Sequence, residues 1–145
     1  DGLVELRDER GFDLLRRAAR YGEPFQARPP AVGALARLGQ FFPERKKPLG
    51  EEIAEFLLDP DFRVRIAAAN ALKTLGDASQ VPALEKMAAR ELDGRGVRMA
   101  RENALALRKG AATDDEVRKL REEFEKLREE NTKLRDRLER LEARK

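Results

Sequence analysis

Apolar residues recur at helical spacing in the stretch from Asp59 to Gly76, D-P-D-F-R-V-R-I-A-A-A-N-A-L-K-T-L-G. Pro60 fits the first turn of a helix, where proline is tolerated, and Gly76 fits the left-handed position that ends one. The pattern predicts a helix whose alanines allow another helix to approach closely. The residues of its apolar stripe are Val64, Ala67, Ala68, Ala71, Leu72 and Leu75.

The same periodicity predicts five further helices up to residue 110 and no strand. Their approximate ranges are 8–21, 29–42, 50–58, 81–92 and 97–109, and the basic segment 43–50 is predicted to be a turn. Leu3, Val4 and Leu6 resemble the end of an earlier helix. The chain opens at Asp1, and Met87 and Met99 are its only methionines, so we expect it to be a piece of a longer protein.

Three of the predicted helices share one sequence frame. R-P-P-A-V-G-A-L-A-R-L-G from Arg28 aligns with R-I-A-A-A-N-A-L-K-T-L-G from Arg65, and R-M-A-R-E-N-A-L-A-L-R-K from Arg98 is a weaker third copy. The arginines of successive copies are 37 and 33 residues apart. A period of this size, built from pairs of helices, is typical of a solenoid.

These residues resemble HEAT repeats, above all D-P-D-F-R-V-R-I-A-A-A-N-A-L-K-T-L-G-D followed by V-P-A-L, and the resemblance spans about residues 8–110. It implies an all-α fold, a right-handed α-solenoid of about three HEAT-like helix pairs in residues 1–110. It also implies a surface that binds other proteins, although fold alone does not determine function.

A narrower resemblance is to the C-terminal region of bacterial zinc metallopeptidases of the aminopeptidase N type (gluzincins), in which degenerate HEAT-like repeats end in a charged helix. The zinc-binding H-E-x-x-H motif of that family is absent, because the chain has no histidine. The resemblance therefore implies a non-catalytic part of such an enzyme, and no catalytic residue carries over.

Residues 111–145 predict a coiled-coil oligomerisation helix. Gly110 to Ala112 would separate it from the repeats, and T-D-D-E from Thr113 to Glu116 fits a capping box at its start. Apolar residues then recur at alternating intervals of three and four through four heptads. The a positions are Val117, Phe124, Asn131 and Leu138, and the d positions are Leu120, Leu127, Leu134 and Leu141.

The polar positions of these heptads favour a parallel, leucine-zipper-like dimer. A lone Asn131 at an a position with leucine at every d position is typical of two strands. A parallel pair would bring opposite charges together at four flanking positions, each exposed pair being worth only ~0.2–1 kcal/mol. The alternative is a single solvated helix that folds back on the repeats. The four pairs are Glu116–Arg121, Glu123–Arg128, Glu130–Arg135 and Arg137–Glu142.

Composition argues against catalysis in this chain. There is no histidine and no cysteine, which removes the commonest general base, the thiol nucleophile and the usual zinc ligands. We therefore predict no enzyme activity, no cofactor and no metal site. No run is long and apolar enough to span a membrane, no signal peptide is apparent, and the compartment stays open between cytoplasmic and secreted.

Basic residues concentrate on the repeats, where residues 1–112 hold 20 Lys and Arg against 17 Asp and Glu, whereas residues 113–145 hold 11 of each. Several lie on helices expected to line a concave groove that could bind an acidic peptide. Nucleic acid is a less favourable ligand, since Asp59, Asp61 and Glu102 interrupt the basic surface of the groove. The alternative is a set of solvated faces, with Arg65 and Arg98 bonded to neighbouring turns. The candidate groove residues are Arg28, Arg63, Arg65, Lys73, Arg98 and Arg101.

The sequence thus predicts a non-catalytic scaffold that docks on a protein partner or a preceding domain and dimerises through its C-terminal helix. A free-standing adaptor for an acidic peptide or protein is the main alternative.

Overall fold

The computed structural model describes residues 2–145, apart from the side chain of Leu3, so the expectations for Asp1 and for that side chain lie outside the described part. Within residues 2–145 every regular element is a helix, which confirms the predicted all-α class. The helices are α1 (Gly2–Glu5), α2 (Gly11–Ala19), α3 (Arg28–Gly39), α4 (Lys46–Glu55), α5 (Phe62–Leu75), α6 (Val81–Arg90) and α7 (Gly94–Glu142), with the short 3-10 helices η1 (Pro43–Arg45), η2 (Phe56–Leu58) and η3 (Ala78–Gln80).

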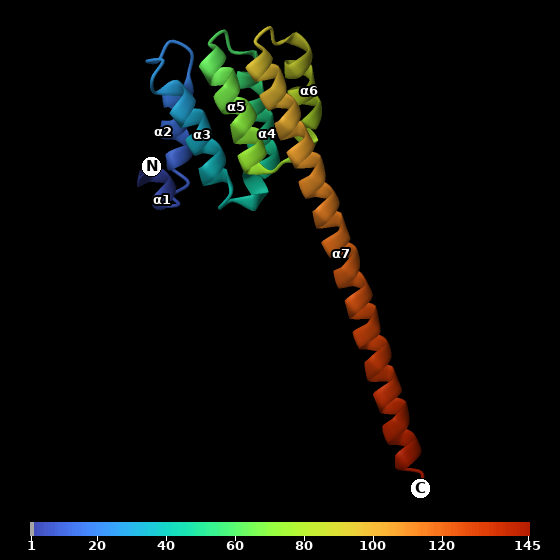
Figure 1. Cartoon of the computed structure of the whole chain (residues 1–145). Coiled ribbons are helices and arrows are strands. Elements are labelled where there is room, and N and C mark those ends of the chain that lie inside the picture. Colours follow the sequence, from blue (N-terminus) through green and yellow to red (C-terminus); the bar gives the residue numbers. More distant parts are fainter. Residues whose placement is uncertain (1) are drawn as a thin grey trace. The chain divides into compact units, whose positions relative to one another are not determined.

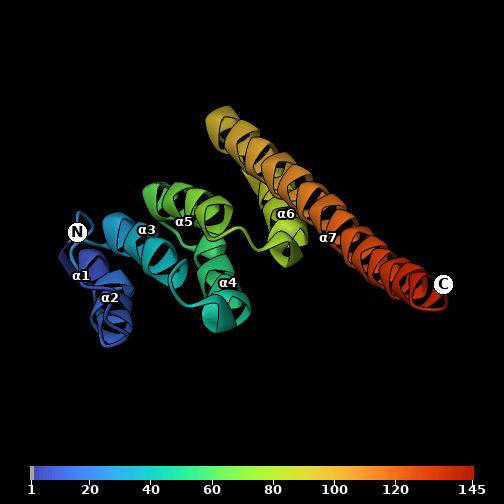
Figure 2. The same ribbon diagram turned by 90° about the horizontal axis from the view of Figure 1, so that it is seen from below.

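The chain divides into two compact units, residues 1–110 and residues 111–145. In the first unit, α2, α4 and α6 form one layer, and α3, α5 and the first turns of α7 form the other (Figure 2). The turns that join α2 to α3, α4 to α5 and α6 to α7 all lie along one edge of the unit (Figure 1). We call this edge the turn edge.

The core of the first unit is aliphatic and rich in alanine. Helix α5 lies at its centre and packs against both α3 and α4. Ala68, Ala69 and Leu72 on this helix are fully buried, so small side chains let the neighbouring helices approach. The ring of Phe12 on α2 meets that of Phe42, just beyond α3, edge to face at 5.5 Å between centroids.

Helix α5 ends where the sequence indicates but begins later. Gly76 has φ 74°, and its N–H donates to the carbonyl of Leu72, as expected for a left-handed C-terminal cap. The N-cap is Asp61, whose carboxylate accepts from the N–H of Arg63. Pro60 therefore precedes the helix, and its predicted place in the first helical turn was wrong.

Two predicted breaks are absent. Segment 43–50 is not a turn but runs through η1 into α4. Residues 110–112 lie within α7, so T-D-D-E from Thr113 to Glu116 is not at a helix start and forms no capping box there. Alanine follows Gly110 twice, and a single glycine costs a helix only about 1 kcal/mol, so one helix continues through this segment.

Candidate interaction surfaces

An ionic ladder, buried at Arg28 and Asp59 and partly buried at Arg65 and Glu91, links the three helix pairs along the turn edge. The Arg28 guanidinium donates to the carbonyl of Ala19 at 3.1 Å and to both carboxylate oxygens of Asp59. The backbone carbonyl of Asp59 in turn accepts from Arg65 Nη1 at 2.9 Å. Arg65 also holds the Glu91 carboxylate with two bonds, at 2.8 and 3.2 Å. Arg28, Asp59, Arg65 and Glu91 thus connect one pair to the next, and we call them the ionic ladder.

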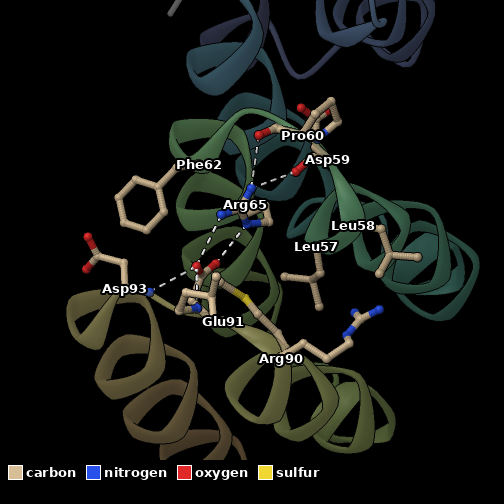
Figure 3. Close-up of a pocket in the computed structure, with 11 residues that line it drawn as sticks. Leu57, Leu58, Asp59, Pro60, Phe62, Arg65, Arg90, Glu91 and Asp93 are labelled. Carbon is tan, nitrogen blue, oxygen red and sulfur yellow. Dashed lines mark hydrogen bonds and ion pairs between the residues drawn. The ribbon is translucent and has the colours of Figure 1, made fainter.

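The ladder follows from the sequence repeat. Arg28 and Arg65 occupy the same position in successive copies, and each reaches forward to a carboxylate just before the next copy begins. Figure 3 shows Arg65 held between the carbonyls of Asp59 and Pro60 on one side and the Glu91 carboxylate on the other. The hydrogen bonds from Arg65 hold the pKa of Glu91 below its ordinary value, even though burial opposes this shift. Arg65 and Glu91 are therefore both charged at neutral pH and form an ion pair.

This arrangement corrects part of the predicted concave groove. Arg28 is only 4% exposed and is fully engaged by Ala19 and Asp59, so it does not line an open surface. Arg65 is likewise bonded to neighbouring turns, which is the alternative that the sequence left open. The sequence predicts an exposed side chain for each of these arginines, because the carboxylate that binds it is 26 to 31 residues away along the chain.

The other groove candidates stay on the surface. Arg63 is exposed and turns back onto Asp61. Lys73, Arg98 and Arg101 are exposed and take part in no hydrogen bond or ion pair within residues 2–145. Of the six predicted residues, four therefore present accessible positive charge.

Two Asp-x-Arg turns, missed by the sequence reasoning, start the second helices of the last two pairs. Asp61 accepts from the N–H and the guanidinium of Arg63, and Asp93 does the same with Arg95. The arginine side chains, and then the backbone N–H groups, hold the pKa of both carboxyls below its ordinary value. The repeated Asp-x-Arg spacing was the signal that could have revealed them.

A cleft of about 550 Å³ opens at the turn edge between the second and third pairs (Figure 3). Its floor includes the buried side chains of Leu57 and Met87, and Leu58 and Leu92 stand on its rim. Arg65 and Glu91 also line the cleft, but they are bonded to each other. The space left for a ligand is therefore mainly apolar.

The third copy of the repeat has a polar outer face. In the alignment, Ala69 of the second copy corresponds to Glu102 of the third. Ala69 is fully buried, whereas Glu102 is exposed. A charged residue at an otherwise packed position is typical of a repeat with a polar outer face. This face is therefore a poor site for a further repeat.

The predicted heptad residues form an exposed apolar stripe in residues 111–145. All residues from 112 to 145 are exposed, so nothing within this unit covers the stripe. The ion pairs of this helix join residues three positions apart, as in Arg118–Asp115 and Arg128–Glu125. Such exposed pairs contribute little to stability. The apolar stripe residues are 41 to 64% exposed: Val117, Leu120, Phe124, Leu127, Leu134, Leu138 and Leu141.

No group of three or more Asp, Glu, Cys or His side chains in residues 2–145 is placed to hold a metal ion. In the same range, no helix combines the length and apolar character needed to cross a bilayer.

The comparison with protein families decides how the helix pairs are classified. Residues 49–106 match the family model of HEAT repeats. This match covers the second and third helix pairs, from α4 into α7, and supports a HEAT-repeat family for the chain. HEAT repeats generally mediate protein–protein interaction and scaffolding and are generally non-catalytic. No curated protein and no solved structure matches the chain.

Proposed function

We propose that this chain is a non-catalytic scaffold with two binding elements. The HEAT-like unit of residues 1–110 binds a protein partner or an adjoining domain, and the apolar stripe of the C-terminal helix pairs two copies of the chain. The match to HEAT repeats supports the first role. The exposed stripe supports the second.

The observation that carries the proposal is the stripe from Val117 to Leu141. A soluble helix with one apolar face normally buries that face, and contiguous apolar patches on a surface mark sites of association. Burying one leucine stabilises an assembly by roughly 1.5–3 kcal/mol. Seven such side chains on one face are therefore enough to outweigh the cost of bringing two chains together.

A second copy is the partner that best fits the stripe. Asn131 at one a position favours pairing with the same residue of an identical helix, since its amide would otherwise be buried without a partner. The four flanking charge pairs, of which Glu123–Arg128 and Glu130–Arg135 are central, are attractive only when the helices run parallel. In an antiparallel pair Glu123 would face Glu130.

The test is the mass of the full chain in solution at micromolar concentration, measured by sedimentation equilibrium. We expect the mass of two chains. Leu127→Glu should give the mass of one chain, because it places two carboxylates in the seam. Thr132→Glu adds the same charge outside the stripe and should remain dimeric. A monomeric native chain, or a dimer that survives Leu127→Glu, would rule out pairing through this stripe.

A finer proposal follows from the resemblance to aminopeptidase N-type metallopeptidases, in which this chain would cover or position the catalytic domains. The reading frame upstream of the codon for Asp1 tests it. An H-E-x-x-H helix followed by a glutamate roughly twenty residues later would support it, since those side chains bind the zinc of such enzymes. A preceding sequence without this motif would argue against it.

The second candidate is a free-standing adaptor that binds an acidic peptide or protein. The observation that favours it is the exposed charge of Lys73, Arg98 and Arg101, which form no ion pair within residues 2–145. Replacing all three by glutamine should abolish binding of an acidic partner and leave the dimer mass unchanged.

A further inference from the structure

The charges beside the apolar stripe change sign once along the C-terminal helix. In the first three heptads of the stripe, a glutamate precedes each a position and an arginine follows each d position. In the fourth heptad the order is reversed, because Arg137 precedes the a position and Glu142 follows the d position. We call Arg137 and Glu142 the inverted residues. The flanking residues of the first three heptads are Glu116, Glu123 and Glu130 on one side and Arg121, Arg128 and Arg135 on the other.

The inverted residues have no polar partner within their own chain. Both are exposed, and neither side chain takes part in a hydrogen bond or ion pair within residues 2–145. Among the flanking side chains of the first three heptads, Arg128 alone does so in the described part of the chain, with Glu125 at 3.4 Å. The charges on both sides of the stripe are therefore available to a second helix.

An identical helix in register would find every flanking contact attractive. In a parallel pair, each residue that precedes an a position faces the residue five places later on the other copy. Arg137 of one copy would then face Glu142 of the other, just as glutamate faces arginine in the first three heptads. The reversed order therefore does not weaken the pairing of two aligned copies.

A shift of one heptad would make the inverted residues repulsive. Glu130 of one copy would face Glu142 of the other. Arg137 of that other copy would face Arg135 of the first. If glutamate and arginine kept the same order in all four heptads, both of these contacts would join opposite charges. The shift would also leave Asn131 opposite apolar residues, so the amide and the inverted residues favour the same register.

From these observations we propose that the inverted residues select a second copy of this chain, in register, over parallel helices whose flanking charges keep one order throughout. Against such a helix, Arg137 would face an arginine and Glu142 would face a glutamate. Repulsion built against other partners is a general source of binding specificity. This inference rests on the proposed pairing of two copies, and it names the residues that choose the partner.

The test uses the variant Arg137→Glu with Glu142→Arg, whose flanking charges keep one order and which should pair with itself as well as the native chain does. The native chain and the variant are each extended after Lys145 by Gly-Gly-Cys, and the variant also carries an N-terminal hexahistidine tag. They are mixed in equal amounts in a glutathione buffer, and the three disulfide-linked dimers are separated by mass. Parallel pairing brings the added cysteines together.

Random exchange would place about half of the linked chains in mixed dimers. We expect the equilibrium constant for forming mixed dimers from the two self-paired dimers to be at least about tenfold below its random value, because the exchange turns four attractive contacts into four repulsive ones. Tenfold corresponds to about 1.4 kcal/mol. In about 1 M sodium chloride, which screens charges beyond about 3 Å, mixing should return toward random.

The matched control is Glu139→Arg with Arg140→Glu, with the same tag and extension. It exchanges two charges in the same heptad at exposed positions that lie outside the stripe, so it should mix at random with the native chain. Equal depletion for the control would overturn the inference, as would random mixing of the variant Arg137→Glu with Glu142→Arg or depletion that persists in high salt.

The mass of the unmodified chain separates this inference from the proposed function. A native chain with the mass of one copy would overturn the pairing and the inference together. A native dimer that mixes at random with the variant would overturn the inference alone. A native dimer whose added cysteines do not link would not be parallel, and it would also overturn the inference.

Discussion

Replacing Arg28 by methionine tests how much the ionic ladder contributes to the first unit. The guanidinium makes three bonds, one to Ala19 and two to Asp59, and the two charged side chains are 5% and 6% exposed. Without Arg28 the Asp59 carboxylate stays buried and keeps only the N–H of Asp61, 2.9 Å away. Breaking a buried ion pair from one side costs about 3–5 kcal/mol. That is a large part of the ~5–15 kcal/mol that stabilises an ordinary domain.

Hydrogen exchange of peptides from α3 and α5 is the assay of choice, because it reports on the first unit alone. Arg63→Met is the matched control, since Arg63 is exposed and its pair with Asp61 should be worth under about 1 kcal/mol. The double variant Arg28→Met with Asp59→Leu should recover most of the lost stability, because no unpaired charge remains. The reasoning would be refuted if Arg28→Met lowered the unfolding free energy by less than about 1 kcal/mol, or by no more than Arg63→Met does.

Three further predictions concern other parts of the chain. Gly39→Ala should lower the unfolding free energy by about 1–3 kcal/mol in the same exchange assay, since the added Cβ would overlap the Leu49 side chain. Unchanged protection of the amides of α3 and α5 from exchange would contradict this prediction. Because Arg65 lowers the pKa of Glu91, this carboxylate stabilises the fold fully above its ordinary pKa of 4.5, and the stabilisation is lost as the pH falls below that value. Urea unfolding of Glu91→Gln should therefore show lower stability at neutral pH and a shallower loss in acid; parallel pH profiles would contradict this. Asn131→Leu should raise the melting temperature of the dimer and admit larger assemblies, and sedimentation showing a less stable, strictly dimeric variant would contradict it.

Local features of the helices could be predicted from the sequence. Gly76 ends α5 because only a residue that tolerates positive φ fits a left-handed cap. Val64, Ala68 and Leu72 are buried because the side of a helix that faces its neighbours must be apolar at a period of 3.6 residues. Both properties depend only on residues within one helix, so they can be predicted directly from the sequence.

Properties that depend on residues distant in sequence could not be predicted. The assignment of Arg28 to an open groove failed because Asp59 lies in the next helix pair, 31 residues away. The predicted helix break at Gly110 failed for a different reason. A weak local preference for a turn is overridden when the residues on both sides favour helix, as Ala111 and Ala112 do.

The ionic ladder also bears on how the first unit unfolds. In a stack of repeats, each pair touches only its neighbours, so the ends of the stack can fray while the middle stays folded. Asp59 binds the preceding pair through its carboxylate, and its carbonyl accepts from Arg65, which in turn binds Glu91 of the following pair. Losing the first pair would remove the guanidinium that Asp59 binds, and losing the third would remove the carboxylate that Arg65 binds. The ladder thus raises the coupling between neighbouring repeats, and the three pairs should open together, as one cooperative block.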